Sequence, residues 1–234
     1  MFEMKKITII IPTLNEAKNI GKLLDAIPKR LLNQMGYSVE CLVVDGGSTD
    51  GTTDIAAKKG ARVLIVRKRG YGLAYMVGFL HATGDIIVTL DADMTYPPES
   101  IPLLVRILER YDYDFVSTNR LKKFETHAFS QAKLLGNKLI NILTFLLYRL
   151  RIGDTQSGMW CFRKNILKTL RLMTLGMEFS TEIKLEAFRR TKAVEIPIFY
   201  RRRMGGTSKI RVIVDGIRIV LFLFYKRIQL LLGF

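Results

Sequence analysis

Cysteine and histidine are scarce in this sequence, which excludes several kinds of chemistry. Its 234 residues include two of each. Cys41 and Cys161 stand far apart and neither belongs to a C-x-x-C pattern, so a zinc ribbon or a thioredoxin-like site has no support. We expect both to be buried free thiols in a reducing compartment. His81 ends a predicted helix and His127 lies outside the predicted elements, so neither is a persuasive general base.

Long apolar runs and a targeting pattern are also missing. No apolar run approaches the ~20 residues that a membrane-spanning helix needs. Met1 leads directly into a strand-like stretch, without the charged start and apolar core of a signal peptide. We therefore expect the protein on the cytoplasmic side of a membrane, attached to its surface at most.

Positive charge is abundant. Lys and Arg number 37 against 21 Asp and Glu, a formal net charge of +16, and 49% of the residues are hydrophobic. That hydrophobic content and a length of 234 residues suit one folded domain. A charge this positive predicts an acidic partner, either nucleic acid, an anionic membrane surface or a phosphorylated substrate. Composition leaves these three open.

Strand-length apolar runs alternate with helix-like segments through the first half of the chain. The runs are 7–11, 39–44, 63–66 and 86–90, and the helix-like segments are 18–27, 52–59 and 73–81. This alternation predicts an α/β fold with a mostly parallel, Rossmann-like sheet and a ligand site beyond the carboxyl ends of its strands. Further helices are predicted at 99–110, 130–150, 179–190 and 210–234, and further strands at 115–118 and 194–200. Because no repeat or linker interrupts the chain, we predict a single catalytic domain over 1–234.

The sharpest motif is the pair of carboxylates Asp91 and Asp93, on either side of Ala92 and directly after the predicted strand 86–90. Two such carboxylates at a strand end can converge on one hard cation if the chain bends between them. Mg²⁺ and Mn²⁺ prefer oxygen ligands and often bridge to substrate phosphates. The motif therefore indicates a divalent-metal site. A solvated acidic turn is the alternative, because D-x-D also occurs by chance.

Two polar loops at strand ends predict a nucleotide pocket. The loop 45–52 reads D-G-G-S-T-D-G-T, and Asp45 is placed to accept hydrogen bonds from a base or ribose; a capped turn without a ligand is the alternative. The loop 12–16 reads P-T-L-N-E and adds the carboxylate of Glu16. Gly70-Tyr71-Gly72 is not a dinucleotide fingerprint, because Tyr75 stands where the third glycine belongs; we interpret it as a turn into the next helix.

The loops 12–16, 45–52 and 91–93, in this order along the chain, resemble the donor-binding half of the inverting GT-A glycosyltransferases of family 2. Cellulose, chitin and dolichyl-phosphate-mannose synthases typify this family. The stretch 91–99, D-A-D-M-T-Y-P-P-E, is similar to the D-A-D-x-Q-x-P-P-E segment of the dolichyl-phosphate sugar synthases in that family. The stretch 154–158 with Phe162-Arg163, and the stretch from Arg203 to Ser208-Lys209, match the same subfamily, so the resemblance covers nearly the whole chain. Thr95 departs from it, because relatives often carry a metal-holding glutamine there; a threonine would reach the metal through water.

The resemblance implies roles for individual residues. The nucleotide-sugar would be bound by Pro12, Thr13, Asn15, Glu16, Val44, Asp45, Asp91 and Ala92. Mg²⁺ or Mn²⁺ would be held by Asp91, Asp93 and Thr95. The catalytic group would be Asp93, Arg120, Asp154, Arg203 and Lys209, in which the cations surround the phosphates at the reaction centre.

The missing histidine base fits an acceptor that is itself a phosphate. A phosphate monoester has a second pKa of about 6, so at neutral pH it is already an anionic nucleophile. A polyprenyl (dolichyl) phosphate acceptor therefore needs no base, and Asp154 remains as a base or as a group that orients the acceptor. The alternative is a GT-A enzyme that transfers sugar to a saccharide hydroxyl, which would need a working base. UDP-glucose, UDP-N-acetylglucosamine and GDP-mannose all remain possible donors, with UDP-sugars favoured by the stretches 154–160 and 176–182.

Two apolar segments with basic ends favour a lipid acceptor. The segments 130–150 and 210–234 are too short of uninterrupted apolar residues to span a bilayer, and both fit amphipathic helices in a membrane interface with Lys and Arg toward the head groups. Core or dimer helices are the alternative. Nucleic acid is not expected as a partner, because the aromatic residues lie in apolar helices and not along a basic face. The sequence does not predict the oligomeric state.

Overall fold

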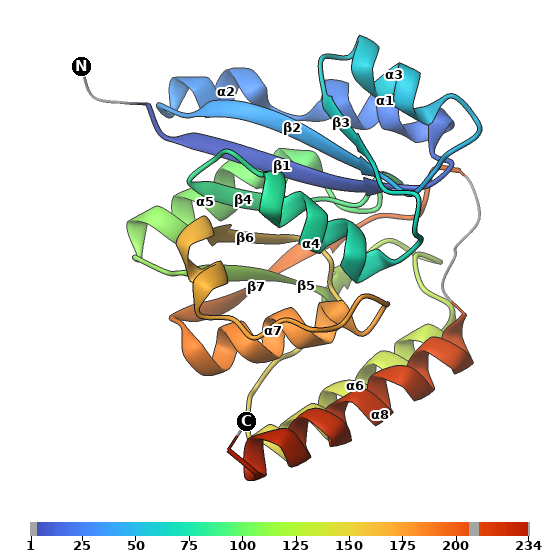
Figure 1. The fold of residues 1–234 in the computed structure, drawn as a ribbon, viewed down its shortest axis with the longest axis vertical. Helices are drawn as coiled ribbons and strands as arrows, with labels where there is room; N and C mark the ends of the chain where they lie inside the picture. The colour runs from blue at the N-terminus through green and yellow to red at the C-terminus, as the bar shows by residue number, and fades with distance from the viewer. Residues whose placement is uncertain (1–3, 206–210, 234) are drawn as a thin grey trace.

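The computed structural model describes residues 4–205 and 211–233, which form a seven-stranded sheet covered by helices on both faces (Figure 1). In order along the sheet the strands are β3 (Arg62–Ile65), β2 (Ser38–Asp45), β1 (Lys6–Thr13), β4 (Ile86–Thr89), β6 (Trp160–Arg163), β5 (Phe115–Phe124) and β7 (Ala193–Tyr200). Strand β6 runs antiparallel to β4 and β5, and the other pairings are parallel. The predicted α/β fold with a mostly parallel sheet is confirmed.

Two hydrophobic cores lie on the two faces of this sheet, because side chains alternate along a strand. In β1, Ile7, Ile9 and Ile11 enter one core and Ile10 enters the other. The first core is closed by α1 (Ala17–Ala26), α2 (Lys29–Gln34), α3 (Thr52–Lys58) and α5 (Ile101–Arg110). The second is closed by α4 (Tyr71–His81) and α7 (Phe179–Arg190). With both faces covered, the open edge for a ligand is the end of the sheet where the parallel strands finish.

Two helices form a separate layer beside this end. The helices α6 (Gln131–Tyr148) and α8 (Val212–Leu231) pack along each other at the bottom of Figure 1. Ile140 meets Ile219, Phe222 and Leu223 in a small third core. Within the described ranges no helix is both long enough and apolar enough to cross a membrane.

The structure differs from the sequence predictions in its short elements. Strand β6 was not predicted, and its four residues, Trp160 to Arg163, are too few to show a period. Helix α2 and the two 3-10 turns, Pro98–Ser100 and Lys164–Lys168, are also short. The other longer elements lie within a few residues of their predicted bounds, but β5 was predicted only over 115–118 and extends to Phe124.

Candidate active site

A cleft of about 490 Å³ opens at the carboxyl ends of β1, β4 and β5. Its walls come from the loop 12–16, the loop after β4, the start of α4 and the first halves of α6 and α8. Parallel strands that end at one edge place their following loops side by side. The cleft therefore gathers the polar loops that the sequence singled out, and it adds α6 and α8 as an outer wall.

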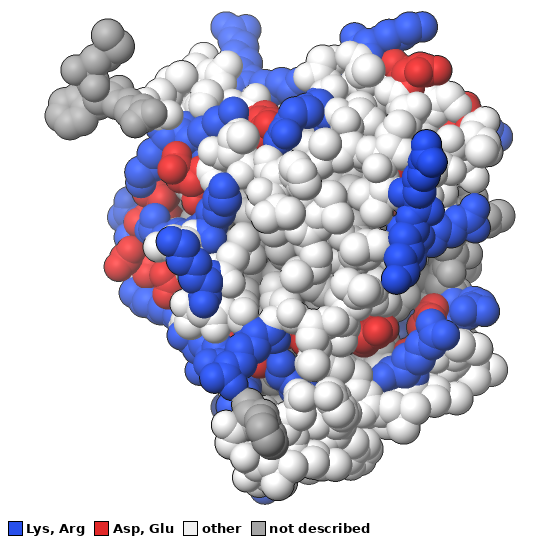
Figure 2. Space-filling model, viewed as in Figure 1, with Lys and Arg blue, Asp and Glu red and all other residues white. Residues whose placement is uncertain are grey.

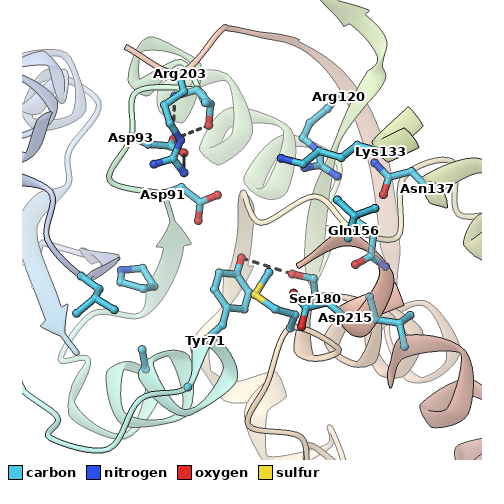
Figure 3. A pocket seen from close by; sticks show the side chains of 18 of the residues that line it. Tyr71, Asp91, Asp93, Arg120, Lys133, Asn137, Gln156, Ser180, Arg203 and Asp215 are labelled. Carbon is cyan, nitrogen blue, oxygen red and sulfur yellow. Dashed lines mark hydrogen bonds and ion pairs between the residues drawn. The ribbon is translucent and has the colours of Figure 1, made fainter. Parts of the chain in front are cut away.

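The acidic centre of the cleft is Asp91 and Asp93 (Figure 3). Asp93 is 6% exposed, and its Oδ1 accepts hydrogen bonds from the Thr95 nitrogen at 3.1 Å and from Thr95 Oγ1 at 2.6 Å. Its Oδ2 lies 2.6 Å from Arg203 Nη2, while Arg203 Nη1 lies 3.1 Å from Glu16 Oε1. Thr95 thus orients Asp93, and the guanidinium of Arg203 bridges two carboxylates.

The surroundings of Asp91 disfavour the charged form of its carboxyl group. Burial, and then the neighbouring charge of Asp93, raise the pKa of Asp91 above its ordinary value. Tyr75 Oη lies 3.5 Å from Asp91 Oδ1 and offers one weak donor. Two neighbouring carboxylates, of which Asp93 is buried and Asp91 partly buried, are stabilised when a cation comes between them.

Three of the cations that line the cleft interact with one another. Arg120, Lys133 and Arg203 all line the cleft, and Figure 3 shows the side chains of Arg120 and Lys133 next to each other. Burial, and then the positive charges of Arg203 and Arg120, lower the pKa of Lys133. Like charges that repel one another this closely make a site that binds an anion such as phosphate.

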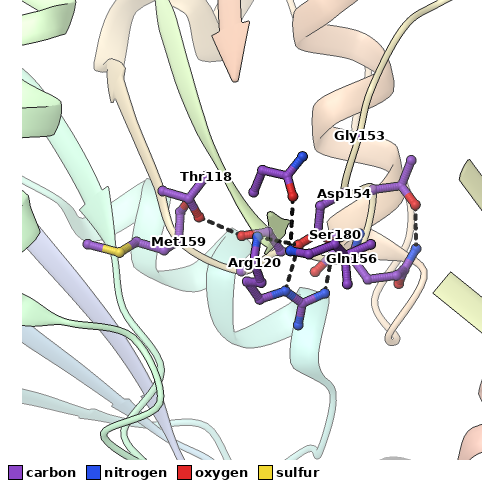
Figure 4. A network of polar contacts seen from close by, with 12 residues as sticks. Thr118, Arg120, Gly153, Asp154, Gln156, Met159 and Ser180 are labelled. Atoms are coloured by element: carbon purple, nitrogen blue, oxygen red, sulfur yellow. Dashed lines mark hydrogen bonds and ion pairs between the residues drawn. The ribbon is translucent and has the colours of Figure 1, made fainter. Parts of the chain in front are cut away.

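Arg120 is fixed by Asp154 beneath the cleft (Figure 4). The Asp154 carboxylate accepts Arg120 Nε at 2.8 Å, Arg120 Nη2 at 2.9 Å and the Arg120 backbone nitrogen at 2.9 Å. The guanidinium lies 5.4 Å from the ring of Phe129 and 5.3 Å from that of Tyr200. Ion pairing and ring contacts together leave Arg120 one orientation.

This position corrects the expectation that Asp154 could act as a base. Asp154 is fully buried and does not line the cleft. Burial alone would raise its pKa, but the Arg120 guanidinium lowers the pKa below its ordinary value. A buried, paired and acidic carboxylate cannot take a proton from an acceptor. Asp154 instead holds Arg120 in place, which the sequence did not predict, and its predicted role in orienting the acceptor stays a prediction.

On the nucleotide side, Asp45 is occupied by its own loop. Its Oδ1 accepts the backbone nitrogens of Gly47 at 2.9 Å and Ser48 at 2.7 Å, and its Oδ2 accepts Thr13 Oγ1 at 3.1 Å. Asn15 is exposed and accepts the Thr49 nitrogen. Both residues therefore shape the loops around the pocket, and neither lines it.

The cleft brings together most of the predicted site residues. Those that line it are Pro12, Thr13, Glu16, Asp91, Asp93, Thr95, Arg120 and Arg203. Val44 and Ala92 are buried in the two cores and have no surface in the cleft. Lys209 lies outside the described residues.

Several lining residues were not named as site residues by the sequence analysis. Lys133 lies in the segment that was assigned to a membrane-interface helix, and Tyr71, which the sequence analysis placed in a turn, is the first residue of α4. Gln156 and Ser180 also line the cleft, and Ser180 Oγ lies 3.4 Å from Tyr71 Oη. The two glycines that flank Tyr71 were the available clue, because glycine pairs often mark a close approach of two backbone segments.

Comparison with known proteins places the chain among glycosyltransferases. A family model described as glycosyl transferase family 2 matches residues 8–171. The low-salt glycan biosynthesis hexosyltransferase Agl6 of Haloferax volcanii is 34% identical over 93% of this chain and 52% of its own length. The dolichol-phosphate mannosyltransferase of Pyrococcus furiosus is 31% identical over 88% of this chain and 59% of its own. An undecaprenyl-phosphate 4-deoxy-4-formamido-L-arabinose transferase of Enterobacter is 35% identical over 87% of this chain and 62% of its own.

The chain spans between about half and three fifths of the length of these curated relatives. Among solved structures, glucosyl-3-phosphoglycerate synthase from Mycobacterium tuberculosis, in complex with Mn²⁺, UDP and glucosyl-3-phosphoglycerate, superposes with a TM-score of 0.76. That match covers 95% of this chain and 80% of the other at 22% identity, which bears on the fold alone. The GT-A fold is thereby confirmed. From the family match and the three relatives, this chain belongs to glycosyl transferase family 2.

Proposed function

We propose that this protein transfers a sugar, with inversion, from a nucleotide-sugar to a polyprenyl phosphate such as dolichyl phosphate, with the help of Mg²⁺ or Mn²⁺. One observation carries the proposal. Arg120, Lys133 and Arg203 line the cleft together with the carboxylates Asp91 and Asp93. Asp154, the carboxylate considered as a base, is fully buried and paired with Arg120. A leaving nucleoside diphosphate and an incoming phosphate are both polyanions. Bringing these two anions together requires positive charges that offset their repulsion, and it does not require a general base.

The residues present fit a divalent cation. Asp91 and Asp93 offer oxygen ligands, and the guanidinium on Asp93 shows that this carboxylate accepts a cation in the cleft. Among the described residues no three His, Cys, Asp or Glu side chains form a ready metal site, so other ligands would come from water and the diphosphate, as Mg²⁺ commonly arranges. When bound, such a cation supplies charge for the leaving diphosphate.

Three of the carboxylates that line the cleft are already engaged, and Asp91 is the exception. Glu16 and Asp93 pair with Arg203, and Asp215 accepts the Arg211 nitrogen at 2.7 Å at the start of α8. A phosphate acceptor does not need them, because it is mostly an anion at neutral pH. Arg120 and Lys133 would hold that phosphate, and rigid positioning would supply much of the rate.

The names of two relatives support this class of acceptor. One is a dolichol-phosphate mannosyltransferase and another an undecaprenyl-phosphate transferase. Both names describe a polyprenyl phosphate, although they differ in the sugar. They favour the acceptor and leave the donor open.

The outer helical layer supports a membrane-bound acceptor. Many large apolar side chains of α6 and α8 are exposed: Leu135, Leu139, Ile142, Leu146, Ile213, Ile217, Leu221, Phe224, Ile228 and Leu231. Figure 2 shows this layer as a mostly uncharged surface with Lys and Arg side chains above it. An apolar surface below a basic band suits an interface with anionic lipids. The same two helices border the cleft, so a lipid held there would be close to Arg120 and Lys133.

We expect Leu139→Asp together with Leu221→Asp to weaken binding to anionic vesicles by about tenfold or more, because two exposed apolar side chains would no longer enter the lipid. Co-sedimentation with vesicles that contain phosphatidylglycerol measures this. Leu80→Asp is the matched control, since Leu80 is 79% exposed on α4, outside the outer layer. Equal losses in both proteins, or no loss in either, would contradict the membrane assignment.

Arg203→Met should change metal and nucleotide binding in opposite directions. Mn²⁺ alone should bind about threefold more tightly, because Asp93 loses a competing cation, and UDP or GDP with Mn²⁺ should bind about threefold more weakly. Electron paramagnetic resonance titration measures the first and calorimetry the second. Arg202→Met is the control, because the Arg202 side chain is exposed. Affinities that move together would show that Arg203 does not compete for the metal position.

The proposed reaction is tested by incubating the protein with Mn²⁺, polyprenyl phosphate in vesicles and each of three labelled donors: UDP-glucose, UDP-N-acetylglucosamine and GDP-mannose. Label from one donor should pass into the organic phase, and product formation should stop when the metal is chelated. Label that stays in the aqueous phase with every donor would count against the proposed reaction.

A second candidate is a GT-A enzyme that acts on a saccharide hydroxyl. The observation that favours it is Asp215, a carboxylate that borders the cleft from α8 and could serve as the base that Asp154 cannot be. The two candidates differ in their acceptor, so an acceptor comparison separates them.

A further inference from the structure

The C-terminal half of α8 carries a buried charge that the proposed reaction does not use. Lys226 is 4% exposed, and its Nζ lies 3.3 Å from Glu186 Oε1 and 3.6 Å from Glu182 Oε1. Nζ also donates to the backbone oxygen of Arg171 at 2.9 Å. Both glutamates belong to α7 and are fully buried. Buried charges are costly unless they are paired, so this cluster fixes how α8 sits on the catalytic domain.

Glu182 links Lys226 to the segment of the chain that precedes α7. Its Oε2 accepts the Thr174 backbone nitrogen at 2.8 Å and Thr174 Oγ1 at 2.6 Å, and Oε1 accepts the Met173 nitrogen at 3.1 Å. One carboxylate thus organises the segment 171–178, which we name the α7 loop. Lys226 balances the charge of that carboxylate from the other side.

The α7 loop in turn supports the wall of the cleft. Its carbonyl oxygens at Leu175 and Gly176 accept the nitrogens of Leu73 at 3.1 Å and Gly72 at 3.2 Å, at the start of α4. A Cβ at Gly72 would lie 2.7 Å from the Thr174 oxygen, so only glycine allows this approach. Tyr71, the residue before Gly72, borders the cleft, as does Met177 of the loop.

Tyr71 lies beside the acidic centre. A Cβ at Gly158 would meet Tyr71 Oη at 2.5 Å and the Asp91 carboxylate at 3.4 Å, so both groups flank the same point of the backbone. Ser180 and Gln156 complete this part of the cleft, away from the loop 12–16 (Figure 3). If the diphosphate lies at Asp91 and Asp93, the sugar of the donor falls beside Tyr71, Met177 and Ser180.

We propose that Lys226 is a positioning residue for the sugar side of the donor site: through Glu182 it fixes the α7 loop, which places Tyr71 and Met177 at the cleft. This inference rests on the proposed function. It also ties the helix with exposed apolar side chains to donor recognition, because Lys226 and Leu221 belong to the same helix, α8. Lipid binding that moves α8 would therefore change the affinity for the sugar.

Calorimetry tests the proposal with UDP-glucose, UDP-N-acetylglucosamine, GDP-mannose, UDP and GDP as probes, each with Mn²⁺. Lys226→Met should lower the association constant of the nucleotide-sugar by about tenfold relative to its nucleoside diphosphate, whose own affinity should stay within about twofold. Glu182→Gln should have the same selective effect, and the double variant should be no worse than Glu182→Gln alone. Lys226→Arg, which keeps the charge, should restore most of the affinity.

Three further variants separate positioning from general damage. Arg218→Met removes an exposed charge from the same helix and should leave both affinities unchanged. Leu108→Ala opens the core on the other face of the sheet, so it should lower the Tm without changing the ratio of the two affinities. Gly72→Ala displaces the α7 loop without touching the charges and should reproduce the selective loss.

Equal losses of nucleotide-sugar and nucleoside diphosphate in Lys226→Met, or no loss in either, would overturn the inference while the proposed function stands. A wild-type protein that binds none of the donors would overturn the proposed function and the inference with it.

Discussion

Replacing Asp93 with asparagine is expected to lower kcat/KM for sugar transfer by about a thousandfold, the scale seen when one electrostatic contact of a transition state is lost. Asparagine keeps the size of the side chain but removes the negative charge that we propose holds a cation against the diphosphate. It also releases Arg203, whose Nη2 lies 2.6 Å from Asp93 Oδ2. The rate of label transfer to lipid, measured over a range of Mn²⁺ concentrations, gives the effect.

Excess metal should recover little of this loss, because the ligand itself is gone. Asp112→Asn is the control, since its side chain is 87% exposed and it lies outside the cleft. Alanine at both Asp91 and Asp93 should abolish transfer. Full activity in that double variant would remove the metal from the account.

Arg120→Met is expected to destabilise the protein by about 3–5 kcal/mol, because it leaves the fully buried carboxylate of Asp154 without its partner. It should also lower transfer by about a hundredfold or more, since one of the cations that we propose hold the acceptor phosphate is lost. Urea unfolding measures the first effect, and the transfer assay measures the second.

The double variant Arg120→Met with Asp154→Asn separates these two effects. Removing both charges should restore much of the stability, because no unpaired charge then remains in the interior. Activity should stay low, because Asp154 acts through Arg120. As a control for exposed pairs, Lys59→Met breaks the contact with Asp25 and should cost about 1 kcal/mol at most. Recovery of activity along with stability would show that Arg120 serves only the fold.

The long elements and the order of the loops could be predicted from the sequence because they depend on local pattern. The side chains of strand β1 alternate between two cores, and Asp91 and Asp93 follow a fully buried strand. The position of the site at the carboxyl ends of the strands could therefore be predicted from the sequence. The pairing of β6 between β4 and β5 was not readable, because it depends on contacts between residues far apart in the chain.

The burial and the partners of individual charged side chains could not be predicted from the sequence. Asp154 and Arg203 both read as polar residues in loops, yet one is sealed beneath the cleft and the other bridges Glu16 and Asp93 across it. Lys133 lies on the helix that was interpreted by its apolar residues, and only tertiary packing brings it opposite Arg120. The sequence showed which residue types were present, and burial decided which of them face a substrate.

The proposed function depends most on the acceptor being an anion, and a matched pair of acceptors tests this directly. Polyprenyl phosphate and the polyprenol of the same chain length are supplied in identical vesicles with Mn²⁺ and the labelled donor. We expect transfer to the phosphate alone, at a rate that Asp215→Asn changes by no more than a few fold. Transfer to the alcohol, abolished by Asp215→Asn, would contradict the account and establish Asp215 as the base of an enzyme that acts on hydroxyl groups.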